Sequence, residues 1–302
     1  MIVTDLNYFL EKPIIKKLDL MLERCTTNHP KRDAVLIVEG GEGEGKTNTS
    51  IANAYYLKYK SKRDIHLFFK LKSLVEFAQA TENKIIIWDE PALDSLSTDW
   101  YKKTNQDLIR LLMVARKKRH FFMFNFTKFY KFSEYIIVDR GLGLIHMYSR
   151  REIEPGRFVY IRKKNLERLY LGWRISKKRL YRKYATSRGS YPDILEKYFD
   201  KMGITVEDIP NATYQDYERE KDKAIASVGR DKVESKADIK LQNEYIDLKI
   251  RVGRLKPPIK NNKELCEQLN LNRKTLYTWG NLKKEAEIGG FPKENGVEKP
   301  QI

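Results

Sequence analysis

The chain has few cysteines and lacks any long apolar run. Only two of its 302 residues are cysteine, Cys25 and Cys266, far apart and without the spacing of a metal site. A disulfide framework is therefore excluded, and a reducing compartment is expected. No apolar stretch approaches the length that crosses a bilayer. Glu11, Lys12 and Pro13 interrupt the apolar stretch near the amino terminus, which argues against a signal peptide. We expect a soluble, cytoplasmic protein.

Acidic side chains are in short supply. The chain carries 59 Lys and Arg against 41 Asp and Glu, a formal net charge of +18 with a pI near 9.6. Such a surplus indicates an anionic partner, and nucleic acid is the usual one for a soluble intracellular chain. The length fits two domains, or one domain with appendages. Hydrophobic residues make up 41% of the chain, which is enough for a packed core.

One short motif carries specific chemistry, because residues 40–47 read Gly-Gly-Glu-Gly-Glu-Gly-Lys-Thr. A buried strand is predicted before it at 34–39 and a helix after it from residue 46. Backbone N–H groups of such a loop, with the positive end of the helix, form a nest for the β-phosphate of a nucleotide. Lys46 then reaches the β- and γ-phosphates, and the Thr47 hydroxyl ligates magnesium. The predicted ATP-binding residues are Gly40, Gly41, Glu42, Gly43, Glu44, Gly45, Lys46, Thr47 and Asn48.

A second segment, residues 84–91, is an apolar run that ends in Asp89 and Glu90. Such a run is often only a core strand with a charged end. After a phosphate-binding loop, it predicts the strand that completes a magnesium site. Asp89 is expected to hold a magnesium-bound water, and Glu90 to polarise the water that attacks the γ-phosphate. The acid pair indicates hydrolysis rather than nucleotide binding alone.

Apolar strands alternate with helices over the first half of the chain, which predicts an α/β fold. Strands are expected near 34–39, 65–70, 84–88, 120–126 and 143–148, and helices near 46–60, 71–80 and 103–118. This alternation predicts a mostly parallel sheet covered by helices on both faces. Nucleotide should lie at the carboxyl ends of its strands.

These motifs resemble the additional-strand, catalytic-glutamate branch of P-loop ATPases. In that branch the fourth strand lies between the two motif strands and ends in a polar sensor, which makes Asn125 the first candidate and Thr127 the second. A leucine-rich helix with an Arg-Lys pair at 105–120 resembles the HerA–FtsK superfamily, and within it Zot-like ATPases. The resemblance covers roughly residues 32–150. It implies a ring, most often a hexamer, that pumps DNA using ATP. Two features depart from the family: the sensor glutamine is absent, and no membrane-spanning segment follows the ATPase.

Ring ATPases commonly insert an arginine into the neighbouring subunit's site. The candidates are Arg110, Arg116, Arg119 and Arg140, and Arg116 is preferred because it matches the Arg-Lys pair of the superfamily. For each of them the alternative is a solvated basic helix face.

Positive charge is concentrated in residues 150–188, which hold 14 Lys and Arg against 3 Asp and Glu. Aromatic residues are interleaved with them, so phosphates could be neutralised while rings stack on bases or pack beneath the basic side chains. A turn is expected at Glu154–Arg157, between strands near 144–153 and 157–163. The alternative is a solvated basic face near the sheet edge. The predicted DNA contacts here are Arg162, Lys163, Lys164, Arg174, Lys177, Lys178 and Arg179.

The last third of the chain has a different character. A linker is expected at 189–192, then a short helix over 193–202, a turn at 210–211 and an exposed, charged helical arm over 213–254. Residues 262–279 resemble a helix-turn-helix, with Arg273, Lys274 and Tyr277 on its outer, DNA-facing side. The alternative is a helical hairpin that docks a protein. The predicted divisions are an ATPase core with an amino-terminal helix (1–150), its basic extension (151–190), the arm (191–256), the helix-turn-helix (257–288) and a disordered tail (289–302).

The sequence therefore predicts a magnesium-dependent ATPase that binds DNA, a homo-oligomeric motor of a virus or mobile element. The rival hypothesis is a DNA-binding regulator or initiator in which ATP controls oligomerisation. A small-molecule kinase fits the charge poorly. A packaging nuclease would need a carboxylate cluster after the core, which the sequence lacks.

Overall fold

The computed structural model describes residues 5–27, 30–89, 98–150, 154–176 and 180–227. The chain divides into two compact units, Met1–Arg230 and Asp231–Ile302, and every described residue belongs to the first. None of the described helices is long and apolar enough to span a membrane.

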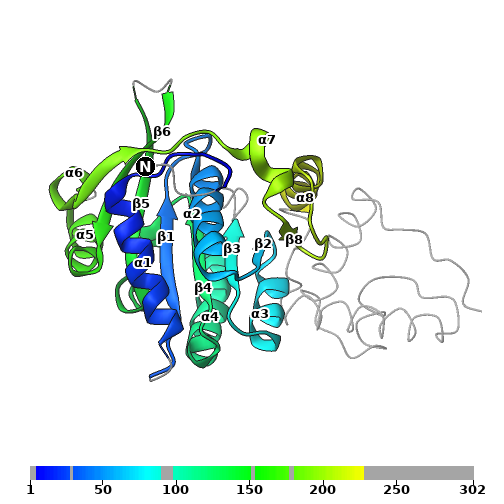
Figure 1. Ribbon diagram of the computed structural model, residues 1–302. Helices are drawn as coiled ribbons and strands as arrows, with labels where there is room; N and C mark the ends of the chain where they lie inside the picture. The colour runs from blue at the N-terminus through cyan, green and yellow to red at the C-terminus, as the bar shows by residue number, and fades with distance from the viewer. Residues whose placement is uncertain (1–4, 28–29, 90–97, 151–153, 177–179, 228–302) are drawn as a thin grey trace, which may run out of the picture. The chain divides into compact units, whose positions relative to one another are not determined.

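The first unit is an eight-stranded sheet with helices on both faces (Figure 1). In chain order its strands are β1 (Ala34–Glu39), β2 (Ile65–Phe68), β3 (Ile85–Asp89), β4 (Phe121–Phe126), β5 (Gly141–Arg150), β6 (Glu154–Arg162), β7 (Ser187–Ser190) and β8 (Ile204–Val206). The α-helices are α1 (Lys12–Thr26), α2 (Lys46–Ser61), α3 (Leu71–Ala80), α4 (Thr98–Val114), α5 (Lys163–Ser176), α6 (Tyr181–Tyr184), α7 (Leu195–Tyr198) and α8 (Tyr214–Ser227). Between them lie the short helices η2 (Ala115–Lys118), η3 (Phe129–Lys131), η4 (Tyr135–Arg140) and η5 (Phe199–Lys201).

The strand order is β7-β6-β5-β1-β4-β3-β2-β8. The six strands from β5 to β8 in that order run parallel, and β6 and β7 add an antiparallel edge. The predicted parallel sheet is confirmed. So is the position of β4, which pairs with β1 on one side and β3 on the other.

The central strands are buried on both faces, which explains why they are continuous apolar runs. In β1, Leu36 and Val38 pack in the layer of α1 and α2, whereas Val35 and Ile37 pack in the layer of α4 and α5. This alternation follows from the period of two along a strand. The carboxyl ends of the parallel strands therefore meet at one edge, which positions the site.

The predicted turn at Glu154–Arg157 is wrong, because these residues lie in β6. Gly156 explains the misassignment. Its φ of 89° lets β6 run close beside the glycine-rich loop, where its N–H donates to the Glu44 carbonyl at 3.4 Å. Its own carbonyl accepts the Tyr191 N–H at 2.8 Å.

Three predictions for residues 187–227 need correction. The expected linker includes Gly189 and Ser190, which form part of β7, and buried Tyr191, whose hydroxyl donates to Asn53 at 2.9 Å. The helix expected over 193–202 is split into α7 and η5. The exposed arm is wrong for α8, because Tyr217 is fully buried against the sheet's core.

Candidate functional site

The glycine-rich loop joins β1 to α2 at the carboxyl edge of the sheet. Gly43 and Gly45 have φ values of 72° and 89°, which glycine adopts without strain. The α2 helix begins at Lys46, and the first N–H groups of any helix have no acceptor within it. These groups and the positive helix end face the loop, an arrangement suited to binding an anion.

The loop is held closed by its own glutamate. The Glu44 carboxylate accepts the Gly41 N–H at 2.7 Å. A Cβ at Gly40 would lie 2.8 Å from both Glu44 Oε2 and the Met147 carbonyl oxygen. Gly40 is therefore required by packing against β5 as well as by the chain turn.

Lys46 points back into the loop. Its Nζ donates to the Gly40 carbonyl at 3.0 Å and to the Gly41 carbonyl at 2.6 Å. Burial lowers the pKa of Lys46, and the nearby Asp89 and Glu39 carboxylates oppose that effect. The ammonium group thus lies at the place where a phosphate in the loop would meet it.

Thr47, after the loop, and Asn125, on β4, both donate hydrogen bonds to Asp89, the last residue of β3. Thr47 Oγ1 donates to Asp89 Oδ2 at 2.9 Å, and Asn125 Nδ2 donates to Asp89 Oδ1 at 2.8 Å. Ser50 Oγ in turn donates to Asn125 Oδ1 at 2.5 Å. A carboxylate beside a hydroxyl is a fitting donor set for magnesium, which also takes oxygens from substrate phosphates.

The structure therefore brings together four predicted site residues: Lys46, Thr47, Asp89 and Asn125. The second sensor candidate, Thr127, lies one residue past the end of β4, and its hydroxyl is buried without a hydrogen-bond partner in the described part of the chain. Glu90 lies outside the described residues.

Asn48 has a different environment from the rest of the loop. Its Nδ2 donates to the Pro192 carbonyl at 2.7 Å, and its Oδ1 accepts the Ile194 N–H at 2.9 Å. The side chain of Asn48 therefore fixes the 192–194 segment against α2, and only its backbone N–H is available to the loop.

Sequence reasoning missed Tyr217 on α8. This fully buried residue places its hydroxyl 3.4 Å from Asp89 Oδ2. Burial, together with the Asp89 carboxylate, raises the pKa of Tyr217, so the hydroxyl stays protonated and donates. The only sequence signal is its spacing from Ala224, the other buried residue of α8, since positions seven apart share a helix face.

A second unpredicted cluster surrounds Glu39, the last residue of β1. Its carboxylate accepts from the Tyr181 hydroxyl at 3.0 Å and lies 2.5 Å from His146 Nδ1. The His146 and Tyr181 rings stack with centroids 3.5 Å apart. This cluster ties the strand that leads into the loop to α6, within the basic segment.

The four arginine candidates separate clearly. Arg140 forms an ion pair with buried Asp33 at the amino end of β1, so it is a structural residue. Arg110 pairs with Asp107 one helical turn away. Arg116 and Arg119 precede β4, at the sheet edge opposite the loop. Exposed Arg116 therefore does not reach the loop of its own chain and could serve only another copy.

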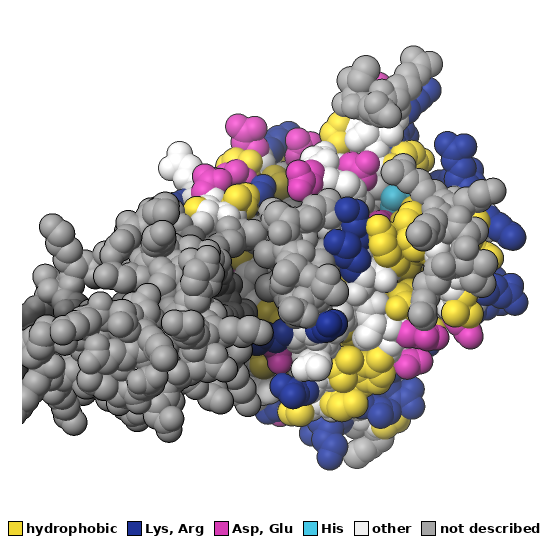
Figure 2. Space-filling model, turned by 180° about the vertical axis from the view of Figure 1, so that it is seen from behind, with side chains coloured by type: hydrophobic (Ala, Val, Ile, Leu, Met, Phe, Trp, Pro, Cys, Tyr) yellow, Lys and Arg dark blue, Asp and Glu magenta, His cyan; other side chains and the backbone are white. Residues whose placement is uncertain are grey.

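In the basic segment, residues 150–188, several aromatic side chains are buried and cationic side chains are exposed. The segment's aromatic residues at 158, 160, 170 and 181 are buried, so they pack in the core and are not free to stack on bases. Arg162, Lys163 and Lys164 are exposed at the junction of β6 and α5. Figure 2, which views the molecule from behind, shows Lys and Arg side chains along the edge where α5 and α6 lie.

The remaining predicted DNA contacts are not placed by the structure. The backbone of Arg174 lies in α5. The others lie outside the described residues: Lys177, Lys178, Arg179, Arg273, Lys274 and Tyr277. The predicted helix-turn-helix lies there as well.

No protein-family model matches this chain, and no curated protein matches it. Among the described residues, no three His, Cys, Asp or Glu side chains form a metal-binding group. From the described residues, a cation at Asp89 would have one protein carboxylate, and magnesium commonly binds in this way when phosphate oxygens complete its shell. The arrangement suits a metal that arrives with a phosphorylated ligand.

Proposed function

We propose that this chain is a magnesium-dependent ATPase that binds DNA and works, as a homo-oligomer, as a DNA-translocating motor of a virus or mobile element. The observation that carries the proposal is the junction of Thr47, Asp89 and Asn125 directly beneath the glycine-rich loop. A P-loop ATPase needs a hydroxyl, a carboxylate and a polar strand end in this arrangement.

Each residue has a defined task in this proposal. The loop N–H groups and Lys46 bind the β- and γ-phosphates, and Thr47 with Asp89 would hold magnesium. When bound, the ion supplies positive charge that offsets charge developing on the phosphates. Glu90, the next residue after Asp89, polarises the attacking water. Asn125 contacts Asp89 and is positioned to respond to the γ-phosphate.

The place of Arg116 supports an oligomer. It is exposed and lies before β4, at the end of the strands away from the loop, so it would act on the loop of a second copy. DNA as partner is supported by the net charge, by the exposed basic side chains of α5, and by the resemblance to the HerA–FtsK superfamily.

The nucleotide-switched regulator remains the second candidate, and Tyr217 is the observation that favours it. This residue joins Asp89 to α8, and α8 immediately precedes in sequence the unit that contains the predicted helix-turn-helix. Nucleotide bound at Asp89 could in this way affect the carboxyl-terminal unit without any DNA movement.

ATP turnover measured against DNA length distinguishes the two candidates, with Lys46→Ala as the blank. A motor shows turnover that rises with DNA length to a plateau. Turnover indifferent to DNA, with tight sequence-specific binding, would move the assignment to the regulator. Absence of turnover under all conditions would overturn the ATPase proposal itself.

A further inference from the structure

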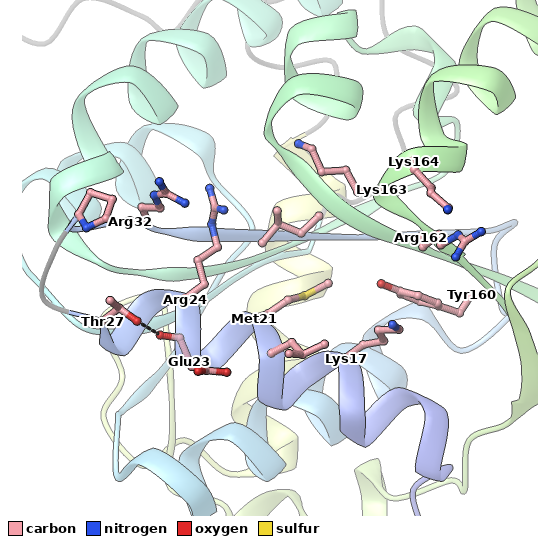
Figure 3. Close-up of a pocket in the computed structure, with 13 residues that line it drawn as sticks. Lys17, Met21, Glu23, Arg24, Thr27, Arg32, Tyr160, Arg162, Lys163 and Lys164 are labelled. Carbon is pink, nitrogen blue, oxygen red and sulfur yellow. Dashed lines mark hydrogen bonds between the residues drawn. The ribbon is translucent and has the colours of Figure 1, made fainter.

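A basic pocket lies at the amino end of β1 and β5, away from the glycine-rich loop. It measures about 590 Å³ and lies between α1, the segment before β1, and the β6–α5 junction (Figure 3). Six of its lining side chains are cationic and one, Glu23, is acidic. The cations are Lys17, Arg24, Arg32, Arg162, Lys163 and Lys164.

The cations repel one another. Burial lowers the pKa of Arg24, and the charge of Arg32 beside it lowers that pKa further. Burial likewise lowers the pKa of Lys163, with Arg24 adding to the effect. Asp33 opposes the shift at Arg24 but already pairs with Arg140, and Asp139 opposes the shift at Lys163. With Glu23, these are fewer carboxylates than the six cations, so an anion in the pocket would relieve the remaining repulsion.

Several of these side chains are already fixed in position. Arg24 Nε donates to the Asp33 carbonyl at 3.1 Å, and Lys163 Nζ donates to the Asp139 carbonyl at 2.7 Å. Arg32 Nε is buried and has no hydrogen-bond partner in the ranges that the structure describes. Because Arg24 and Lys163 are held before a ligand arrives, these two side chains lose little entropy when it binds.

The rest of the pocket is apolar. Met21, Leu142 and Tyr160 line it, and Leu20, 58% exposed, lies beside them on α1. In Figure 3 the Tyr160 hydroxyl points toward Met21, and Arg162 and Lys164 lie at the other side from Arg24 and Arg32. Charges at two sides of an apolar floor suit a ligand with successive phosphates joined by flat or apolar groups.

We propose that this pocket binds the phosphate backbone of a nucleic-acid strand, at the sheet edge opposite the ATP site. The inference rests on the proposed function and adds a location to it. Phosphates would lie against the cations on the two sides, and a sugar would lie over the apolar floor. The strand would contact α1 and α5 and would not approach the γ-phosphate.

The test is a salt titration of binding to a fluorescein-labelled oligothymidylate, read by anisotropy on the full-length chain. Arg162→Gln/Lys164→Gln removes two exposed charges from the pocket. Lys70→Gln/Lys72→Gln is the matched control, because both lysines are exposed and lie near α3. The pocket variant should bind about tenfold more weakly, and its slope of log affinity against log salt should fall by about 2. The control should match the wild type.

ATP binding checks that each variant is folded, and Arg24→Gln/Arg32→Gln gives a second pocket variant.

Other results would overturn the proposal in distinguishable ways. Unchanged salt slopes in both pocket variants, with wild-type DNA binding present, would exclude the pocket and leave the proposed function intact. Wild-type chain that binds no oligonucleotide would overturn both. If free thymidine monophosphate displaced the oligonucleotide equally well per phosphate, the pocket would be a site for a free nucleotide and not for a strand.

Discussion

The two edges of the sheet differ in how charge is balanced. At the carboxyl edge, the buried Asp89 carboxylate receives hydrogen bonds from Thr47, Asn125 and Tyr217, and Lys46 donates to loop carbonyls. At the amino edge, the buried carboxylate of Asp33 lies near Arg24 and Arg140. At the carboxyl edge, hydrogen-bond donors surround the Asp89 carboxylate. At the amino edge, cationic side chains outnumber carboxylates.

This difference separates two kinds of phosphate recognition. The glycine-rich loop offers backbone N–H groups and one lysine in a fixed geometry, which suits a single nucleotide in a defined pose. The amino edge offers six cationic side chains around an open pocket, which suits a polyanion that binds by charge. The sheet then joins a specific site to a less specific one.

Breaking the buried ion pair between Arg140 and Asp33 at the amino edge should have the largest effect. Arg140→Met leaves Asp33, 3% exposed, without its partner. Removing one partner of a buried pair typically costs about 3–5 kcal/mol, because the remaining charge is uncompensated. Urea unfolding at neutral pH should show this loss. Arg110→Met, at an exposed pair, should cost about 1 kcal/mol or less.

A second variant tests whether the loss comes from the unpaired charge of Asp33. Arg140→Met/Asp33→Asn should recover much of the loss, since no charge is then buried. The loss in Arg140→Met should also shrink in acid, because protonation of Asp33 removes the charge. A single variant as stable as the wild type would show that the surrounding arginines already neutralise Asp33.

The carboxyl edge was largely predictable from sequence, and the amino edge was not. The glycines of the motif at 40–47 have a fixed spacing because the turn of the loop imposes it, and β3 is an apolar run, so both could be predicted from the residues. The place of β4 between β1 and β3 was expected from the resemblance to P-loop ATPases. The pocket is formed by residues 17–32 together with residues 160–164, and no short sequence motif indicates that these distant segments lie side by side. Strands β7 and β8 were missed because they are short edge strands without an apolar run, and Tyr217 because it lies in a highly charged helix.

The charge of Asp89 is the corresponding test at the carboxyl edge. Asp89→Asn keeps the shape of the side chain but removes the negative charge beside Thr47. If magnesium binds there, ATP turnover should fall about 100- to 1000-fold, while nucleotide binding measured without magnesium stays near the wild-type value. Asp208→Asn, an exposed position, should leave turnover unchanged. Equal turnover in Asp89→Asn and the wild type would remove Asp89 from the site.

His66, near the amino end of β2, should give a smaller effect, seen in the pH dependence of the free energy of unfolding. Burial, with a contribution from Lys84, lowers the pKa of His66 to about 4 from its usual 6.5. Between these two pH values the unfolded chain binds a proton at His66 and the folded chain does not. The contribution of His66 to the free energy of unfolding is therefore fully present above pH 6.5 and falls as the pH drops toward 4. With allowance for partial exposure, the loss is roughly 1–3 kcal/mol.

His66→Phe should remove this part of the pH dependence, because phenylalanine keeps the contact with the Phe77 ring and does not titrate. Urea unfolding of the variant and the wild type at several pH values gives the difference directly. The same pH dependence in the variant and the wild type would mean that folding does not shift the pKa of His66.

The smallest expected effect concerns the hydrogen bond between Tyr217 of α8 and Asp89. Tyr217→Phe removes only the hydroxyl that donates to Asp89 Oδ2. Groups that orient a metal ligand commonly change metal affinity by tenfold or more, and the long contact favours about tenfold here. The magnesium concentration that half-saturates nucleotide binding should rise by that factor, with the free energy of unfolding little changed.

Tyr214→Phe, on the same helix, is the control. If the two variants behave alike, Tyr217 only fills space, and the regulator hypothesis loses the observation that favours it. If they differ, the Tyr217 hydroxyl acts on Asp89, and α8 is coupled to the metal site.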